Sequence, residues 1–524
     1  MKNLVNILKK YRVDVDSAIT YGKYIAKIKP IFKKPATNKK LILVTATSPT
    51  PAGEGKTTVS IGLNDGLNKI GKSSIVAIRE PSMGPVFGAK GGANGGGKSQ
   101  VIPKEDIDFH FTGDMHAITA ANNLIAACVD NEVYWNSSLN IDPNKIIWKR
   151  VVDMNDRGLR QITVTIDPKK NITYKTGFDI TAASELMAIF CLSKNIDELA
   201  NKINNIVVAY TKDNKPVYVK QLGITNAILK ILHTAFYPNA VQSLEGNLAL
   251  IHGGPFANIA HGCNTIITTN TAMNIADYTV TEAGFASELG AEKFIDIVTN
   301  ELGKFPNAVV LVTSLRSLKL HGGQTGDLSI ENIEALKNGF DNLQRHINNI
   351  KNFNIPFVVA INQFHTDTKN EINTIQKFLT QQKIPFSLCT NFANGSKGTT
   401  DLAKKVVTLC NKRSNPKRIY ELADPLKTKV EKICKKCYGA RKVIYSDLAQ
   451  TKLKEFSKLK GYYVCMAKVP GSLTDDPTIS VIDKPFDIHV KDIVLANGAK
   501  FIILLTGSIF RMPGLSKEPQ AKKM

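Results

Sequence analysis

Apolar residues near the start of the chain gather in short runs that alternate with polar and glycine-rich loops. Residues 41–45, Leu-Ile-Leu-Val-Thr, precede a loop that contains proline and glycine, which predicts a buried parallel strand feeding a turn. Residues 56–71 then carry apolar positions at helical spacing, and residues 73–78 form a second apolar run. This order of strand, glycine loop, helix and strand is typical of a βαβ unit in an open α/β sheet, whose ligands bind beyond the carboxyl ends of the strands.

The same kind of pattern continues along the chain. Residues 1–40 predict an amphipathic helix followed by a connector that contains lysine and proline. More strands are predicted at residues 307–315, 355–364, 486–496 and 501–507. We therefore predict an α/β fold with a P-loop-type open parallel sheet in a large N-terminal domain and two smaller α/β or α+β domains. The predicted domains span residues 1–345, 346–440 and 441–524.

Composition and length are those of a multidomain soluble enzyme. The 524 residues are 43% hydrophobic and 22% charged, and this length predicts about two to four domains. All apolar runs fall short of the roughly 20 residues that cross a bilayer, and the first residues lack a signal-peptide pattern, so a cytoplasmic protein without membrane partners is expected. The eight cysteines lack the spacing of a disulfide framework, and reduced thiols are expected.

The formal net charge of +23 raises the question of a nucleic-acid partner. The lysines are spread along the chain among asparagine and isoleucine, and no motif that reads DNA or RNA accompanies them. A nucleic-acid-binding protein is therefore the weakest of the alternatives, and no nucleic-acid partner is expected. A positive field also suits an enzyme whose substrates are anions.

The most explicit chemistry lies in residues 50–58, TPAGEGKTT, here called the phosphate loop. It ends like a Walker A motif, although Thr50 stands where the first glycine belongs. Gly53 and Gly55 allow backbone N–H groups to face phosphate oxygens, Lys56 is expected to hold the terminal phosphates, and the Thr57 hydroxyl to bind Mg²⁺. The alternative is a simple strand-to-helix turn with an exposed lysine. The residues predicted to bind ATP are Thr50, Pro51, Ala52, Gly53, Glu54, Gly55, Lys56, Thr57 and Thr58.

A second glycine-rich loop follows the second predicted strand. Seven glycines fall within residues 84–97, and such a run lets the backbone approach a ligand closely. Arg79 stands at the carboxyl end of that strand, where its guanidinium could grip a carboxylate or a phosphate. Pairing of Arg79 with a structural carboxylate is an equally good interpretation. Several acids and histidines in residues 105–116 make a metal site conceivable, but helix caps and solvated loop residues are the better interpretation.

With these segments in place, the sequence closely resembles the formate–tetrahydrofolate ligases along nearly its whole length. The resemblance is carried by the strings TPAGEGKTT, REPSMGPVFGAKGGANGGG, HFTGDMHAITAANNL, WKRVVDMNDR, LEGNLALIHGGPFANIAHGCN, TEAGFASELGAEKF, KLHGG, FHTDT and MPGLSKEP. It implies that formate attacks the γ-phosphorus of ATP to give formyl phosphate and ADP, and that N10 of tetrahydrofolate then attacks the formyl carbon and expels phosphate.

The same resemblance assigns roles to particular residues. Lys56 and Arg79 become the catalytic residues, and Arg79 is expected to hold the formyl phosphate. Glu80 and Asp114 are expected near the folate. Phe364 and Phe392 are expected to stack on the pterin ring, with Phe392 standing where the family usually has tryptophan.

The resemblance also implies a homotetramer and a monovalent cation beside ATP, Mg²⁺, formate and tetrahydrofolate. Two alternatives stay open at this point. One is a P-loop ATPase that hydrolyses ATP without formyl transfer. The other is a descendant that binds nucleotide or folate without turnover, because Phe392 and Ser508 depart from the family pattern.

Overall fold

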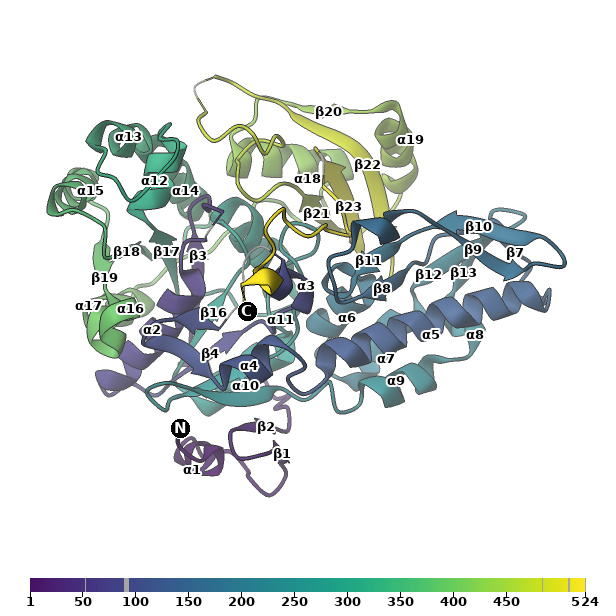
Figure 1. Ribbon diagram of the computed structural model, residues 1–524, viewed down its shortest axis with the longest axis horizontal. Helices are drawn as coiled ribbons and strands as arrows, with labels where there is room; N and C mark the ends of the chain where they lie inside the picture. The colour runs from purple at the N-terminus through teal and green to yellow at the C-terminus, as the bar shows by residue number, and fades with distance from the viewer. Residues whose placement is uncertain (52, 89–93, 483, 508, 524) are drawn as a thin grey trace.

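A computed structural model describes residues 1–51, 53–88, 94–482, 484–507 and 509–523, and its centre is one large sheet (Figure 1). Twelve strands of the described residues belong to it. Seven neighbouring strands run parallel to one another, in the spatial order β15, β4, β16, β3, β17, β18 and β19. In spatial order the main path is β1 (Ile19–Tyr21), β2 (Ile25–Lys27), β14 (Asn239–Ser243), β15 (Leu248–Ile251), β4 (Ser74–Ile78), β16 (Tyr278–Glu282), β3 (Lys40–Ala46), β17 (Ala308–Thr313), β18 (Phe357–Asn362) and β19 (Phe386–Cys389), with β6 (Ser99–Ile102) beside β14 and β5 (Gly95–Gly96) beside β6. The prediction of an α/β fold with a mostly parallel sheet is confirmed.

Helices cover both faces of the parallel strands, which explains why these strands are almost wholly apolar. In β3, Ile42 and Val44 pack in one buried cluster with α2 and α17, whereas Leu41 and Leu43 pack in another with α10 and α14. The helical segments around the sheet are α1 (Leu4–Lys10), α2 (Lys56–Lys69), α3 (Met83–Phe87), α4 (Lys104–Asp108), α10 (Ile266–Ile275), η3 (Ser287–Ala291), η4 (Phe294–Val298), α11 (Thr299–Leu302), α12 (Leu315–His321), α13 (Ile333–Asn338), α14 (Phe340–Asn352), α15 (Lys369–Gln381), α16 (Asn391–Asn394), η5 (Gly395–Thr399) and α17 (Thr400–Cys410).

The predicted first unit is confirmed as β3, α2 and β4, although β16 lies between the two strands in the sheet. The prediction for residues 1–40 is right for the helix α1 and wrong for the connector. Part of that connector forms the hairpin β1–β2, which extends the sheet by pairing with β14. Strands of three residues are too short to show the alternation that identifies longer ones.

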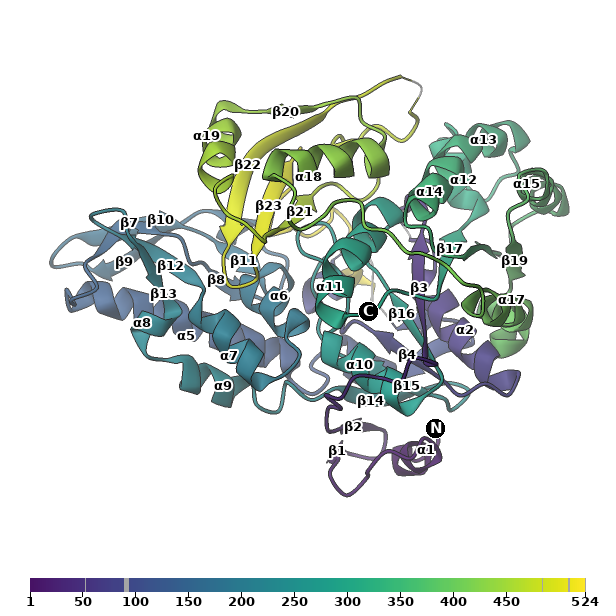
Figure 2. The same ribbon diagram turned by 180° about the vertical axis from the view of Figure 1, so that it is seen from behind.

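An arm extends to one side of the sheet and is built around the long helix α5 (Figures 1 and 2). No strand or helix was predicted for most of this arm. Its further elements are β7 (Ile141–Ile146), β8 (Arg150–Val152), η1 (Arg157–Arg160), β9 (Ile162–Asp167), β10 (Ile172–Thr176), β11 (Phe178–Ile180), η2 (Thr181–Ala183), α6 (Glu185–Leu192), α7 (Ile196–Asn204), β12 (Val207–Thr211), β13 (Pro216–Tyr218), α8 (Val219–Leu222) and α9 (Thr225–Leu232), and α5 itself spans Asp114–Tyr134.

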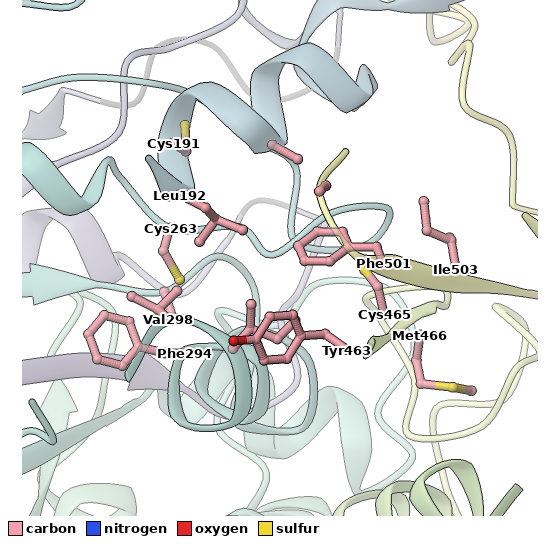
Figure 3. Packing of buried hydrophobic residues seen from close by; sticks show 14 of the residues in the cluster. Cys191, Leu192, Cys263, Phe294, Val298, Tyr463, Cys465, Met466, Phe501 and Ile503 are labelled. Carbon is pink, nitrogen blue, oxygen red and sulfur yellow. The ribbon is translucent and has the colours of Figure 1, made fainter. Parts of the chain in front are cut away.

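The C-terminal part of the chain forms a separate four-stranded sheet in the order β20-β22-β23-β21. Its strands β22 and β23 confirm the two strands predicted there. Figure 3 shows Phe294 and Val298 near Tyr463 and Phe501, so the C-terminal sheet shares a buried apolar cluster with the rest of the chain. The elements are α18 (Leu426–Ile433), η6 (Cys434–Tyr438), β20 (Val443–Tyr445), α19 (Asp447–Phe456), β21 (Tyr463–Ala467), β22 (Ile488–Ala496), β23 (Phe501–Thr506) and η7 (Gln520–Lys522).

The division into three domains stays a prediction. Strands β18 and β19, which fall in its middle part, pair within the large sheet. Within the described ranges, every helix is too short or too polar to cross a bilayer.

Candidate active site

A cavity of about 390 Å³ opens where β3 and β4 end and α2 begins. Most of the phosphate loop and the beginning of the second glycine-rich loop line it, so two segments predicted separately meet at one place. The lining residues are Ala46, Pro49, Gly53, Glu54, Gly55, Lys56, Thr57, Thr58, Arg79, Glu80, Pro81, Ser82, Pro85, Val86, Gly95, Gly254, Phe256 and Phe285.

The phosphate loop needs glycine at two positions. Gly53 and Gly55 have φ angles of 85° and 70°, which L-residues with a side chain rarely adopt. A Cβ on Gly55 would lie only 2.3 Å from Nδ2 of Asn362, whereas a Cβ on Gly53 would meet open space. Gly55 is the residue before α2, so the unpaired backbone N–H groups and the positive end of the helix dipole lie at the cavity.

Lys56 lines the cavity and donates from Nζ to the carbonyl oxygen of Phe285 at 3.2 Å. Burial lowers the pKa of Lys56, Glu282 opposes that shift, and the positive charge of Arg79 adds to it. Phe285 has a φ angle of 57°, a strained conformation for a bulky residue, and such strain is often found at functional sites. Lys56 therefore holds its charge in a partly desolvated place beside a second cation.

Thr57 and Glu282 form a pair of oxygen groups suited to a metal ion. The hydroxyl of Thr57 donates to the carboxylate of Glu282, at 3.1 Å from Oε1 and 3.0 Å from Oε2. Mg²⁺ prefers such oxygen ligands and is usually held by one or two protein groups together with water and substrate phosphates. The described residues contain no group of three or more His, Cys, Asp and Glu side chains arranged to hold a metal by themselves. A hydroxyl and a carboxylate at the phosphate loop fit Mg²⁺ that arrives with a nucleotide.

Side chains from neighbouring strands brace the phosphate loop. Glu54 accepts a hydrogen bond from the backbone N–H of Thr50 at 2.8 Å, and it also accepts one from the Ser314 hydroxyl. Burial raises the pKa of Glu54 to about 7, although the two hydrogen bonds act to lower it. From the end of β18, Asn362 donates from Nδ2 to the backbone carbonyl of Glu54 at 3.0 Å. Of the other loop residues, Pro51 is exposed, and Ala52 lies outside the described residues.

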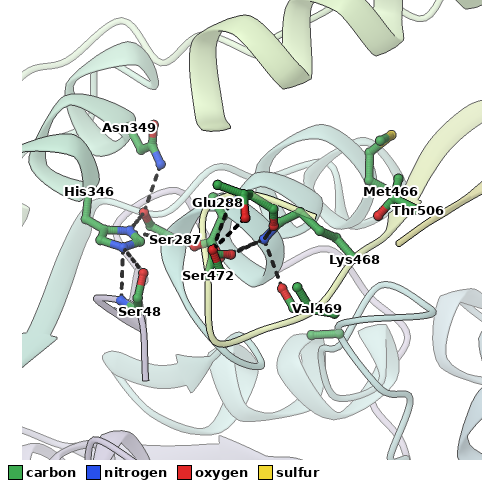
Figure 4. Close-up of polar contacts among 12 residues, drawn as sticks. Ser48, Ser287, Glu288, His346, Asn349, Met466, Lys468, Val469, Ser472 and Thr506 are labelled. Atoms are coloured by element: carbon green, nitrogen blue, oxygen red, sulfur yellow. Dashed lines mark hydrogen bonds and ion pairs between the residues drawn. The ribbon is translucent and has the colours of Figure 1, made fainter. Parts of the chain in front are cut away.

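A buried polar cluster ties Ser48, which lies between β3 and the phosphate loop, to distant segments (Figure 4). His346 Nε2 lies 2.9 Å from both the backbone nitrogen and the hydroxyl oxygen of Ser48. Its Nδ1 lies 2.8 Å from the hydroxyl of Ser287, to which Asn349 also donates. Burial lowers the pKa of His346 to about 3, so the imidazole is neutral at physiological pH and can bridge the two hydroxyl groups.

Arg79 stands at the carboxyl end of β4, as predicted, and faces the cavity. Its Nη1 donates to the carbonyl of Pro255 at 3.0 Å, while its Nε is buried and has no hydrogen-bond partner in the described part of the protein. Among the described residues no carboxylate forms an ion pair with Arg79. This arrangement favours an anionic ligand over structural pairing.

Glu80 lines the cavity in the loop after β4, and Asp114, the first residue of α5, lies close to it. Burial and the neighbouring charge of Asp114 raise the pKa of Glu80 well above its usual value, and Lys27 opposes this. Asp114 is itself held by an ion pair of 2.7 Å with the buried Lys27 and by a hydrogen bond from Asn239. In the described structure no donor group bonds to Oε2 of Glu80, and its contact with Asp114 adds to the raised pKa of Glu80.

The two expected folate-stacking residues follow neighbouring parallel strands. Phe364 comes two residues after β18, and the guanidinium of Arg316 lies 4.4 Å from its ring centre. Phe392 lies in α16 after β19 and is 57% exposed. The fold thus brings both rings to the sheet edge that also carries the phosphate loop. Ser508, the other departure from the family pattern, lies outside the described residues.

Sequence reasoning missed three residues of this site: Glu282, Ser314 and Asn362. Each is polar and stands at or just after the carboxyl end of an apolar run, namely β16, β17 and β18. That position was a usable signal, because parallel strands collect such residues at one edge. In residues 105–116, Glu105 and Asp106 lie in the first turn of α4 and Asp114 in that of α5, in keeping with the interpretation as helix-end residues.

Comparison with known proteins agrees with this geometry. A family model described as formate–tetrahydrofolate ligase matches residues 1–524. A formate–tetrahydrofolate ligase of Pelagibacter ubique (strain HTCC1062) is 49% identical over 532 residues, covering 99% of this chain and 95% of that protein. A match of this extent includes both loops of the cavity and the segments that carry Phe364 and Phe392, and so the chain belongs to the formate–tetrahydrofolate ligase family.

Proposed function

We propose that the cavity at the phosphate loop is where this enzyme of the family joins formate to tetrahydrofolate at the expense of ATP. In the first step an oxygen of formate attacks the γ-phosphorus of ATP, and ADP leaves. In the second step N10 of tetrahydrofolate attacks the carbon of formyl phosphate, the carbon–oxygen bond to phosphate breaks, and N10 loses a proton. The products are 10-formyltetrahydrofolate, ADP and phosphate.

The phosphate loop and Lys56 bind the nucleotide in this proposal. Residues 50–58 form the binding loop, in which the backbone N–H groups at the start of α2 would face the phosphates. Lys56 exchanges the carbonyl of Phe285 for phosphate oxygens. Thr57 and Glu282 would hold Mg²⁺, which neutralises phosphate charge when bound. Phosphoryl transfer depends mainly on positioning and charge neutralisation, and these residues supply both.

Arg79 is the residue proposed to receive formate and then formyl phosphate. Its guanidinium lines the same cavity as Lys56, and its Nε is free to donate within the described structure. A planar guanidinium suits both a carboxylate and a phosphate. The meeting of Lys56 and Arg79 in one cavity is the observation that carries the proposal, because it places a nucleotide phosphate beside a carboxylate-binding group.

Folate is proposed to enter beside the phosphate loop. Phe364 and Phe392 would stack on the pterin ring, and Glu80 with Asp114 would contact the folate near the reacting centre. Gly96 links this region to the cavity, because a Cβ there would lie 3.0 Å from the Phe392 ring while the neighbouring Gly95 lines the cavity. The homotetramer, the monovalent cation and the cytoplasmic location also belong to this proposal and rest on the resemblance and the composition.

The test measures ADP and 10-formyltetrahydrofolate formed by the purified protein with MgATP, in reactions with formate, with tetrahydrofolate, with both and with neither. Both products should appear in equal amounts only when both substrates are present. ADP release independent of formate would instead identify an ATPase. Absence of both products in every reaction, with nucleotide still bound, would identify a non-catalytic descendant.

A further inference from the structure

The segment that carries Phe392 is bound directly to the helix that begins at the phosphate loop. Asn391, the residue before Phe392, donates from Nδ2 to the backbone carbonyl of Thr58 in the first turn of α2 at 2.9 Å. Thr399, at the end of η5, donates from its hydroxyl to the carbonyl of Gly62 one turn further on at 2.6 Å. Both side chains are fully buried, and α16 lies beside α2 in Figure 1.

Two glycines of α2 make this contact close. A Cβ on Gly62 would lie 2.5 Å from Nδ2 of Asn391, and a Cβ on Gly66 would lie 2.7 Å from the hydroxyl of Thr399. Glycine inside a helix lowers its stability relative to alanine. Here it allows segment 391–399 to sit against the helix backbone, so the two cannot shift independently.

The residues that follow the second glycine-rich loop hold the same segment as well. The backbone N–H of Lys98 donates to the carbonyl of Phe392 at 2.8 Å, and the hydroxyl of Ser99 donates to the carbonyl of Asn391 at 3.2 Å. Gly97 has a φ angle of 57°, and a Cβ there would lie 2.1 Å from the Phe392 carbonyl oxygen. Phe392 is therefore fixed at its backbone while its ring stays exposed.

We infer that Asn391 and Thr399 are positioning residues that couple nucleotide binding at the start of α2 to folate binding at Phe392. Nucleotide phosphates order the first turn of α2 through its N–H groups, and Asn391 is bonded to a carbonyl of that same turn. Ordering this turn orders segment 391–399, so folate binds beside a backbone that has already lost its freedom. The inference rests on the proposed function, because it takes Phe392 as a folate contact.

The experiment measures the dissociation constant of tetrahydrofolate for the full-length protein, without nucleotide and with a saturating non-hydrolysable ATP analogue plus Mg²⁺. In the wild type the nucleotide should tighten folate binding about ten-fold, within the usual range of coupling between sites, and folate should tighten nucleotide binding equally. Thr399→Val keeps the buried shape and removes the hydroxyl, and Asn391→Leu removes the amide. Each should lower the ratio of the two folate constants to about two-fold or less.

The control is Asn394→Ala, which alters an exposed asparagine of the same short helix whose amide bonds only to Thr390 of its own turn in the described structure. It should keep the wild-type ratio. If Asn391→Leu does not fold, the result for Thr399→Val decides. A merely structural role would weaken both binary affinities and leave their ratio unchanged, and that outcome overturns the inference. A wild type that binds both ligands with a ratio of one overturns it too, while a wild type that binds no folate overturns the proposed function as well.

Discussion

Lys56 and Arg79 follow different strands, β3 and β4, and they share a cavity only because the sheet places both strand ends at one edge. The two positive charges close together would repel one another in an empty site, and burial already lowers the pKa of Lys56. Anionic phosphate and carboxylate groups relieve that repulsion, which makes the pair well suited to bind them together.

Arg79→Ala should lower kcat/KM for formyl transfer by at least about 100-fold, because a preorganised charge at the reacting groups is lost. Nucleotide affinity should change by less than about three-fold, since the phosphate loop and Lys56 remain. Steady-state kinetics and equilibrium nucleotide binding check both values. Arg79→Lys is the matched control, and it should recover only part of the activity because lysine cannot form the two-pronged contact. Near-normal activity of Arg79→Ala would remove Arg79 from the mechanism.

Phe392→Trp should tighten tetrahydrofolate binding by about three-fold, because the larger ring adds stacking area at an exposed position. Fluorescence titration or calorimetry measures the dissociation constant. The control is Phe510→Trp, at another exposed phenylalanine whose ring is covered by Arg160 instead, and it should leave folate binding unchanged. An unchanged or weaker affinity in Phe392→Trp would argue against stacking there.

Glu54 gives the stability of the protein a definite dependence on pH. Burial raises the pKa of Glu54 to about 7 from an ordinary value of 4.5, so the folded protein holds this proton more tightly than the unfolded chain does. The stabilising contribution is therefore complete below pH 4.5 and is lost as the pH rises to about 7. As the pH rises through this range, the unfolding free energy of the wild type should fall relative to that of Glu54→Gln. Denaturant titrations at several pH values measure it, and a constant difference would contradict the assigned pKa.

At the scale of secondary-structure elements, the unit from β3 through α2 to β4 is the part that the sequence predicts best. Its strands are continuous apolar runs, its loop contains the required glycines, and its helix has the expected spacing. The hairpin β1–β2 escaped prediction because three-residue strands depend on pairing with β14, a contact that no local pattern reveals. The bonds from Asn391 and Thr399 to α2 were equally hidden, because they join residues far apart in the chain.

The turn into α2 should tolerate alanine differently at its two left-handed glycines. Gly53→Ala and Gly55→Ala each place alanine at a positive φ angle, which should lower the folding stability by about 1–3 kcal/mol. Only Gly55→Ala also pushes a Cβ against Asn362, so it should lower the melting temperature and nucleotide affinity clearly more than Gly53→Ala does. Thermal unfolding of the two variants with and without nucleotide provides the comparison. Equal effects of the two substitutions would mean that the Asn362 side chain moves away from the new Cβ with little loss of stability.

At the scale of the whole molecule, family membership and the α/β class follow from the sequence, while the arm around α5 does not. Its short strands pair in small separate sheets, and the three-stranded one joins β7 to β12 and β13, which lie far apart in sequence. Of the site, Lys56, Arg79 and the loop glycines were predicted because motifs and strand ends mark them. Glu282 and Ser314 were not, since their partners Thr57 and Glu54 are brought to them only by the folded sheet.

The two proposed chemical steps predict where each oxygen atom of formate ends up in the products. Formate labelled with ¹⁸O at both positions should be supplied to the enzyme with MgATP and tetrahydrofolate, and the phosphate product analysed by mass spectrometry. If formate attacks the γ-phosphorus and the carbon–oxygen bond then breaks, each phosphate released will carry one ¹⁸O atom, and the other will remain in the formyl group. Unlabelled phosphate formed together with 10-formyltetrahydrofolate would contradict formyl phosphate as the intermediate.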